Sequence, residues 1–221
     1  MTRVAHPVLA ALPDTRRQLL DALKKRGPQT VEALAAAGGI TVSGARQHLS
    51  ALEKDGLVLH RVLRQGPGRP KHLYELSPAA DALYPRTYAA LTNELLEYVR
   101  EDEPELLERI FERRRQRRLE RGQARTAGLS LAEKVAELAR ILDEDGYLAE
   151  AEALPDGTFR VVEHNCAVLD VARRYGQACG SELEFIRQLL PEADVERVAH
   201  LLAGAFVCAY QVKPRDRPAR Q

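Results

Sequence analysis

Residues 41–58 read TVSGARQHLSALEKDGLV, and this stretch decides the fold of the N-terminal part of the chain. Apolar residues recur in it at spacings of three and four, which predicts an amphipathic helix. These residues are Val42, Ala45, Leu49 and Leu52. Thr41 or Ser43 can begin this helix, and Asp55-Gly56 can end it.

The segments on either side of this helix complete a known order of elements. Two helical patterns precede it, at about 14–26 and 30–37, and a turn with two glycines separates the last two helices. Two short strand-like runs follow, 57–64 and 71–76, joined by a turn rich in glycine and proline. Helix, short helix, turn, helix and basic hairpin is the order of a winged helix-turn-helix.

Polar and basic side chains on the outer face of the 41–54 helix are candidates for binding double-stranded DNA. An α-helix fits the major groove, where arginine pairs with guanine and glutamine with adenine. Glycine lets the backbone approach the duplex, hydroxyls hold phosphates, and cations on a hairpin contact phosphates or enter a minor groove. The alternative is an ordinary solvated face and a surface loop. The predicted DNA-binding residues are Thr41, Ser43, Gly44, Arg46, Gln47 and Ser50 on the helix, and Arg64, Arg69 and Lys71 on the hairpin.

Composition limits the class of protein. The chain has 221 residues, of which 45% are apolar and 29% charged, a soluble globular balance. No apolar run approaches the roughly 18 residues of a membrane span, and the N-terminus lacks a secretory pattern, so we expect a cytoplasmic protein without a membrane partner. The sequence contains no Gly-rich phosphate loop, GxSxG or HExxH motif, and nothing in it favours an enzyme.

Charge is distributed unevenly along the chain. Residues 1–80 contain twelve Lys or Arg and six Asp or Glu, whereas residues 129–210 contain seven and fifteen. A basic N-terminal part and an acidic C-terminal part indicate two functions, with a polyanion bound by the N-terminal part.

The periodicities predict a mainly α protein with small β elements (α+β) and four parts. Residues 1–77 form the winged helix-turn-helix, 78–128 a helical linker or dimerisation region, 129–212 an α+β sensor domain, and 213–221 a disordered tail. Within the third part we expect a helix at 130–145 and a hairpin at 147–165. Two helices and a strand pair follow, at 168–175, 181–190, 195–202 and 206–212.

All three cysteines lie in the acidic C-terminal part, with the spacing C-x12-C-x28-C. They are Cys166, Cys179 and Cys208. Thiolates from separate segments can converge on one soft metal centre, either an iron–sulfur cluster or zinc. The spacing alone is weak evidence, because buried cysteines are also common in ordinary cores.

Two resemblances sharpen these expectations. Residues 41–58 and the segment 66–76 (GPGRPKHLYEL) resemble the recognition helix and wing of ArsR-like and DeoR-like bacterial repressors. The segments His164-Asn165-Cys166, Cys179 to Glu184, 195–197 and 208–210 resemble the C-terminal module of SufR-type repressors, which sense iron–sulfur status. The resemblance implies a homodimeric, DNA-binding repressor of iron–sulfur assembly genes. It also implies that Cys166, Cys179 and Cys208 ligate a cluster, a 4Fe–4S centre in the best-understood members, and that the cluster-loaded form represses.

The sequence departs from this family in one respect. Some members have a fourth cysteine near Ala193, and this chain has none there. We expect the remaining iron to take His164 first, with Asp194, His200, another oxygen or an outside molecule as alternatives. For His200 a surface or packed side chain is the favoured interpretation. The alternative function is a winged-helix repressor that senses zinc, thiol oxidation or an organic effector.

Overall fold

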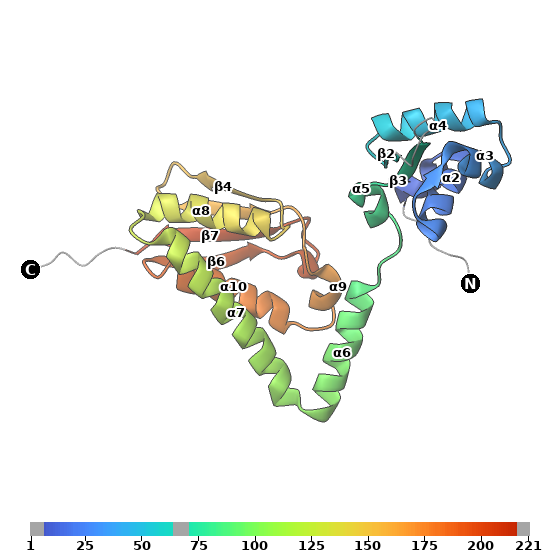
Figure 1. Cartoon of the computed structure of the whole chain (residues 1–221). Coiled ribbons are helices and arrows are strands. Elements are labelled where there is room, and N and C mark those ends of the chain that lie inside the picture. The colour runs from blue at the N-terminus through green and yellow to red at the C-terminus, as the bar shows by residue number, and fades with distance from the viewer. Residues whose placement is uncertain (1–6, 64–70, 216–221) are drawn as a thin grey trace, which may run out of the picture. The chain divides into compact units, whose positions relative to one another are not determined.

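The computed structural model describes residues 7–63 and 71–215. The chain divides into two units, Met1–Arg86 and Thr87–Gln221, and each unit has its own hydrophobic core. Both units combine helices with a small antiparallel sheet (Figure 1). The predicted mainly α class with small β elements is therefore confirmed.

The N-terminal unit contains the predicted helix-turn-helix and its hairpin. Helices α3 and α4 form the helix pair, and strands β2 and β3 form the hairpin, with β1 on the outer side of β3 in the sheet order β1-β3-β2. The elements are α1 (Pro7–Ala11), α2 (Asp14–Arg26), β1 (Gln29–Thr30), α3 (Val31–Ala37), α4 (Val42–Lys54), β2 (Val58–Leu63), β3 (Lys71–Leu76) and α5 (Pro78–Ala82). The short helix α1 is absent from the sequence prediction.

Side-chain caps and apolar burial hold α4 in place. The Thr41 hydroxyl accepts a hydrogen bond from the backbone N–H of Gly44 at 3.1 Å, so Thr41 is the N-cap. Three of the four predicted apolar positions, Ala45, Leu49 and Leu52, are completely buried in the core of the unit. Burying a leucine contributes about 1.5–3 kcal/mol, and these contacts therefore fix the rotation of α4 about its own axis.

The N-terminal unit extends past residue 77, where the sequence places its boundary. Ser77 caps α5 by accepting from the N–H of Ala80 at 3.0 Å. The hydroxyl of Tyr84 donates to Asp21 on α2 at 3.0 Å, and Lys24 pairs with Asp81. These contacts attach α5 and the turn after it to the helix-turn-helix, so the unit ends at Arg86.

The C-terminal unit is a four-stranded antiparallel sheet with helices. Its strand order is β4-β5-β7-β6, so the last strand of the chain is an inner strand. The elements are α6 (Tyr88–Asp102), α7 (Pro104–Thr126), α8 (Leu131–Glu144), β4 (Ala149–Ala153), β5 (Phe159–Glu163), α9 (Leu169–Ala172), α10 (Gln177–Leu189), β6 (Ala193–Ala199), a 3-10 turn η1 (Leu201–Ala203) and β7 (Cys208–Pro214).

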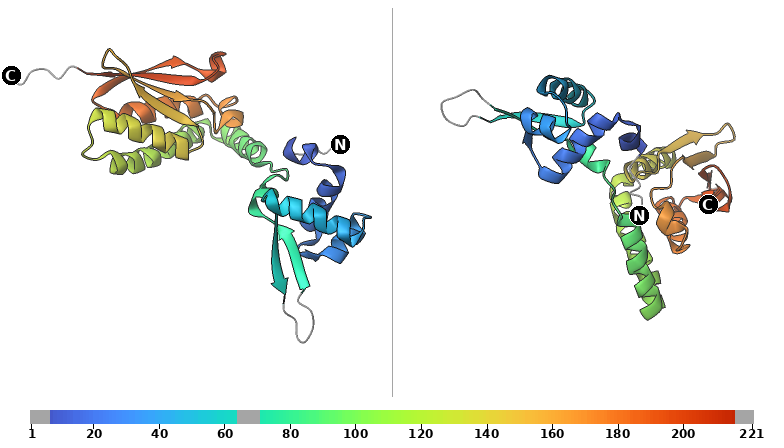
Figure 2. Two further views of the ribbon diagram at one scale, coloured as in Figure 1. Left: turned by 90° about the horizontal axis from the view of Figure 1, so that it is seen from above. Right: turned by 90° about the vertical axis from the view of Figure 1, so that its right-hand side faces the viewer.

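Helices α8 and α10 pack on the same face of this sheet (Figure 2). Side chains alternate across each strand, and Val161, Tyr210 and Val212 point to the helix-covered face, where they are buried with Leu138 and Phe185. The register pairs Glu163 on β5 with Cys208 on β7, which places these two residues side by side.

Helix α7 is part of the C-terminal unit and does not form a separate linker. It lies along α10, and a Cβ added at Gly122 would be 3.0 Å from Leu189, so the two helices approach closely there. Leu107, Phe111 and Leu119 of α7 are buried. The structure thus joins residues 87–128 to residues 129–212 in one unit, because the apolar stripe of α7 is used within that unit.

A second, smaller core lies in the same unit. It joins α6 and α7 to the segment around α9, and its buried members are Leu107, Phe111, Ala172, Tyr175 and Ala178. The Tyr175 hydroxyl donates to the carbonyl of Asn93 on α6 at 3.0 Å, and the Asn93 amide donates to the carbonyl of Asp170 at 3.1 Å. Helix α6 is thereby fixed to the α9 segment.

Several predicted boundaries in this unit differ from the structure. Helix α10 begins at Gln177 and not at Ser181, so Cys179 lies in its first turn. Strand β6 ends at Ala199, and β7 begins at Cys208, which leaves Phe206 outside the strand and 90% exposed. Strand β7 continues to Pro214 into the predicted disordered tail, whose last residues, 216–221, lie outside the described part of the chain.

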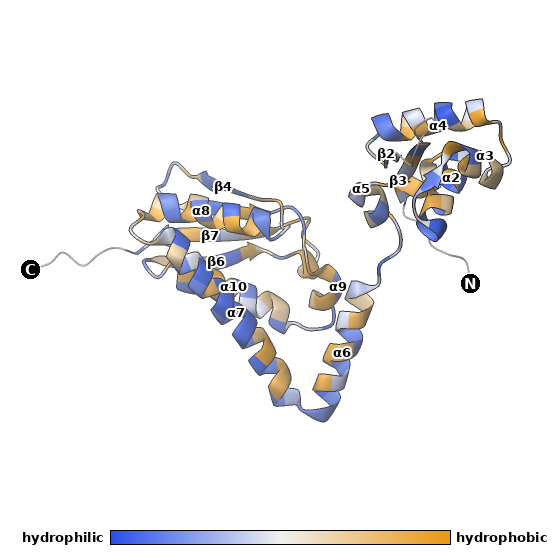
Figure 3. Ribbon diagram, viewed as in Figure 1, coloured by the Kyte–Doolittle hydropathy of each residue, from blue (hydrophilic) through white to orange (hydrophobic). Residues whose placement is uncertain are grey.

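Apolar and polar bands alternate along the helices (Figure 3), and most apolar side chains are buried in the cores, with an exposed apolar row on α6 as an exception. Within residues 7–63 and 71–215, no helix combines the length and the apolar character that crossing a bilayer requires.

Candidate functional site

The outer face of α4 presents most of the predicted DNA-binding side chains to solvent. Thr41, Ser43, Arg46, Gln47 and Ser50 are exposed, and Gly44 is half-buried. A Cβ at Gly44 would be 3.2 Å from the Thr41 hydroxyl oxygen, so glycine here also protects the N-cap. The structure thus brings these residues together on one surface, with the Thr41 hydroxyl already occupied by the cap.

The hairpin β2–β3 lies mostly in described residues, but its basic tip does not. Arg64 and Arg69 lie outside the described residues, and Lys71 begins β3 without a described side chain. Arg61 on β2 is exposed and lies 3.7 Å from Glu75 on the neighbouring strand. The predicted contribution of the tip to DNA binding therefore stays a prediction.

The three cysteines line one pocket, although 42 residues separate the first from the last. Cys166 follows β5 in a loop, Cys179 lies in the first turn of α10, and Cys208 is the first residue of β7. Cys208 packs against the main core of the unit, whereas Cys166 and Cys179 pack against the smaller one. The pocket, which we call the thiol pocket, thus lies where the two cores meet.

The thiol pocket is nearly filled by its own side chains. Its open volume is about 20 Å³, which holds about one water molecule. Among the described residues, no three His, Cys, Asp or Glu side chains are arranged to hold a single metal ion as they stand. A larger occupant requires the thiols and the connections that carry them to move apart.

Burial controls the charge of the thiols. It raises the pKa of each of the three thiols above its ordinary value, and the neighbouring thiols and buried carboxylates add to this effect. The thiols are therefore protonated at neutral pH. Because metals bind the thiolate, loading this pocket releases protons.

A buried polar network forms the floor of the thiol pocket. The carboxylate of Glu182 accepts hydrogen bonds at one oxygen from Arg118 at 2.8 Å and from Tyr147 at 3.0 Å. Tyr210 donates to Glu163 at 3.4 Å. Burial, together with the nearby Glu182, raises the pKa of Glu163 to about 8.

Four buried polar atoms around the pocket have no hydrogen-bond partner within residues 7–63 and 71–215. They are Oε1 of Glu163, Oε1 of Glu182, Nε of Arg197 and Nε2 of His200. Buried polar atoms are normally paired, and unpaired ones in a native fold call for an occupant, an ordered water or an ion. Of these four atoms, the imidazole nitrogen of His200 suits a soft metal centre together with the three thiols, whereas the guanidinium Nε of Arg197 is a hydrogen-bond donor and binds no metal.

The structure changes the order of the candidate fourth ligands. His164 does not line the pocket; its side chain is 43% exposed and its Nε2 lies 3.8 Å from Glu150. It lies just after β5, which ends at Glu163. Asp194 is exposed and accepts from Arg215 at 2.7 Å. His200, the less favoured candidate by sequence, is the histidine that lines the pocket, and no sequence pattern indicates this.

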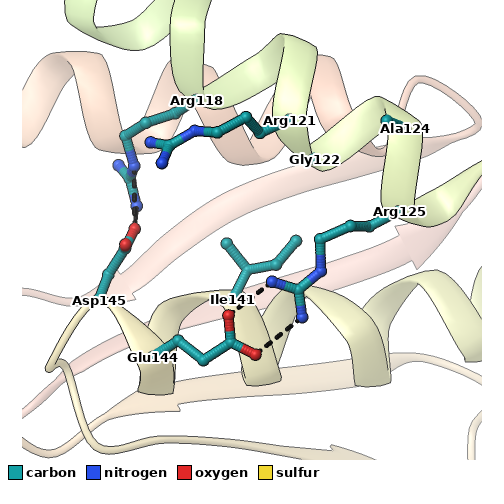
Figure 4. A pocket seen from close by; sticks show the side chains of 8 residues that line it. All are labelled: Arg118, Arg121, Gly122, Ala124, Arg125, Ile141, Glu144 and Asp145. Carbon is teal, nitrogen blue, oxygen red and sulfur yellow. Dashed lines mark hydrogen bonds and ion pairs between the residues drawn. The ribbon is translucent and has the colours of Figure 1, made fainter.

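A separate groove between α7 and α8 is occupied by ion pairs (Figure 4). Arg118 donates to Asp145 at 2.8 Å, and Arg125 donates to Glu144 at 2.6 and 2.9 Å. Both guanidinium groups are thus committed to carboxylates of the same unit, which indicates a structural role for these arginines.

Comparison with known proteins identifies the front of the chain. A family model described as a helix-turn-helix domain matches residues 14–61. No curated protein matches the chain. Residues 14–61 therefore form a helix-turn-helix domain, and the hairpin completes a winged form of it, the DNA-binding module of transcription regulators.

Two solved structures are similar over part of the chain. One is a MarR family transcriptional regulator from Silicibacter pomeroyi, with 22% identity over 48% of this chain and 72% of that one, and a TM-score of 0.32. The other is BpsR of Bordetella bronchiseptica, whose DNA binding 6-hydroxynicotinic acid regulates, with 20% identity over 63% of this chain and 88% of that one, and a TM-score of 0.28. TM-scores this low support no argument about a ligand of the thiol pocket.

Proposed function

We propose that this winged helix-turn-helix regulator is a homodimeric repressor that binds operator DNA through α4 and the hairpin and senses iron–sulfur status through the thiol pocket. One observation carries the sensing part of this proposal: three cysteines from three separate segments line one pocket. The class of cofactor comes from the resemblance of the segments around these cysteines to SufR-type repressors. Cys166, Cys179 and Cys208 would hold the cluster.

The resemblance to SufR-type repressors, and not the spacing of the thiols, favours a cluster over zinc. Zinc binds thiolates at about 2.3 Å in a tetrahedron. In the part of the chain that the structure describes, no three His, Cys, Asp or Glu side chains form a group that would hold one metal ion, so either occupant requires the thiols to move. A cluster supplies a redox centre whose properties depend on its ligands, hydrogen bonds and solvent exposure.

Helix α6 offers a route from the pocket to the DNA-binding unit. Leu96 and Val99 on its inner face pack against the small core that also contains Cys166 and Cys179. The chain leads from α6 directly into the N-terminal unit at residue 86. An occupant that moves these two cysteines therefore moves the surroundings of α6. A coupling free energy of about 1–3 kcal/mol would change operator affinity about 5- to 150-fold.

The outer face of α6 is the proposed dimer contact. Leu91, Leu95 and Tyr98 are each about half exposed, and their spacing of four and three residues continues back to Tyr88. Apolar residues at this spacing form the seam of paired helices. A second copy of the chain that covers this seam would place two recognition helices on one operator, as palindromic half-sites require.

Anaerobic reconstitution of the full chain with iron and sulfide tests the proposal. We expect a brown protein with iron and acid-labile sulfide in equal amounts, and an operator affinity, measured on sites selected from random DNA, that differs between loaded and metal-free protein. Replacing all three cysteines with serine should abolish both results. A colourless protein with one zinc per chain would contradict the cluster. Unchanged DNA control in the triple variant would support an organic effector.

A further inference from the structure

His200 occupies the side of the thiol pocket that carries no cysteine. It lies between β6, which ends at Ala199, and the 3-10 turn η1, which begins at Leu201. Its side chain lines the pocket, and its Nε2 is shielded from solvent and has no hydrogen-bond partner in the described part of the chain. A shielded imidazole nitrogen normally has a hydrogen-bond partner or a bound ion, so Nε2 of His200 is open to a partner from outside the chain.

The backbone holds His200 beside one of the three thiols. The N–H of Leu201 donates to the sulfur of Cys208 at 3.4 Å. The carbonyl of His200 accepts from the N–H groups of Ala203 at 3.0 Å and Ala205 at 3.2 Å. This double contact fixes the turn that presents His200, and the same turn leads to Cys208. The imidazole and the thiol therefore belong to one rigid connection.

The other charged side chains of the pocket, Glu163, Glu182 and Arg197, each have one hydrogen-bonded group and one atom without a partner among the described residues. Glu182 pairs through one oxygen with Arg118 and Tyr147, and Glu163 accepts from Tyr210. Carboxylate oxygens also suit hard cations such as magnesium and calcium, whereas imidazole suits iron. Of the pocket residues besides the cysteines, His200 has the nitrogen that fits an iron centre and that no protein group has taken.

We propose that Nε2 of His200 is the fourth protein ligand of the cluster that the thiol pocket holds. This inference rests on the function proposed above. It places a neutral nitrogen where an all-cysteine site has a fourth thiolate. A mixed site of this kind carries less negative charge at the iron, and in known two-iron centres histidine ligands raise the reduction potential.

Pulsed EPR on the reduced, reconstituted full chain labelled with 15N-histidine tests the assignment. A histidine bound to iron gives a strong nitrogen hyperfine coupling, which thiolates do not. We expect this coupling in the parent protein and in His164→Ala, the matched control, because His164 is exposed and outside the pocket. We expect it to vanish in His200→Ala. His200→Cys should lose the coupling but retain iron and sulfide, because a thiolate can replace the imidazole.

The outcomes separate the two proposals. A parent protein that takes up no iron and sulfide overturns the cluster and the histidine ligand together. A loaded parent protein without nitrogen coupling, or with coupling that persists in His200→Ala, overturns the histidine ligand alone. Should His200→Ala fail to fold, as circular dichroism would reveal, His200→Cys still decides: iron retained with the coupling lost supports the ligand, and coupling retained contradicts it.

Discussion

Replacing Arg118 with methionine should destabilise the C-terminal unit more than any exposed ion pair can. The guanidinium is 5% exposed, and it donates to Glu182 at 2.8 Å and to Asp145 at 2.8 and 3.1 Å. It also lies 4.5 Å from the centre of the Phe185 ring. Methionine preserves most of the apolar stem but leaves the carboxylate of Glu182 buried with Tyr147 as its remaining donor.

The expected cost is about 3–5 kcal/mol of unfolding free energy, because removing one partner leaves an uncompensated buried charge. Arg125→Met is the matched control on the same helix. Arg125 also makes three hydrogen bonds to carboxylates, those of Glu137 and Glu144, but its side chain is 36% exposed. Solvent screens this pair, and its loss should cost about 1 kcal/mol or less.

Native-state hydrogen exchange read by mass spectrometry is the suitable assay, because a chain of two units need not unfold in one step. The opening free energy of the amides in α7 and α10 should fall in Arg118→Met and stay nearly unchanged in Arg125→Met. Amides of the N-terminal unit serve as an internal reference. Equal losses in the two variants, or a loss below about 1 kcal/mol in Arg118→Met, would refute the reasoning from burial.

Three further predictions concern the DNA-binding face of α4, the outer face of α6 and the buried carboxyl of Glu163. Arg46→Ala should weaken binding to a selected operator by about 1–3 kcal/mol in a gel-shift titration, whereas Arg140→Ala, which removes the same charge from the C-terminal unit, should not. Leu95→Glu should convert the proposed dimer to a monomer in sedimentation velocity, because it places a charge in the α6 seam; a dimer unaffected by this change would contradict that seam. The pKa of Glu163 is about 8 in the folded chain, against an ordinary value of 4.5. Between about pH 5 and 8 this carboxyl is therefore ionised in the unfolded chain but protonated in the folded chain. The free energy of unfolding should fall as pH rises through this range. Glu163→Gln should flatten this pH profile in urea denaturation of the metal-free chain, and an unaltered slope would count against the burial of that carboxyl.

The front of the chain was predictable because local signals there agree with the tertiary fold. The apolar spacing of α4, the N-cap at Thr41 and the two-glycine turn before it all indicate the same structure, and the core then buries the expected side chains. A helix beginning at Pro78 was predicted, but as part of the linker, because Ser77-Pro78 resembles a boundary. The contacts of Tyr84 with Asp21 and of Asp81 with Lys24, which are distant in sequence, show that the unit continues.

The back of the chain was less predictable because burial overrides local signals there. Gly180-Ser181 has the pattern of a helix start, yet α10 runs through it, since Ala178 is buried on the same face as Phe185 and Leu189. The cysteines were identifiable by type alone. The choice between His164 and His200 depended on strand β5 ending at Glu163 and on the turn after β6, and periodicity specifies neither.

The position of β7 has a consequence for biosynthesis. This strand follows β6 in the chain but lies between β5 and β6, so the sheet cannot close until residues up to 214 have left the ribosome. The N-terminal unit, whose contacts are complete by residue 86, can fold well before that. A chain whose translation stops before Cys208 therefore retains a helix-turn-helix but lacks the strand that completes the thiol pocket, and every nascent chain passes through this stage.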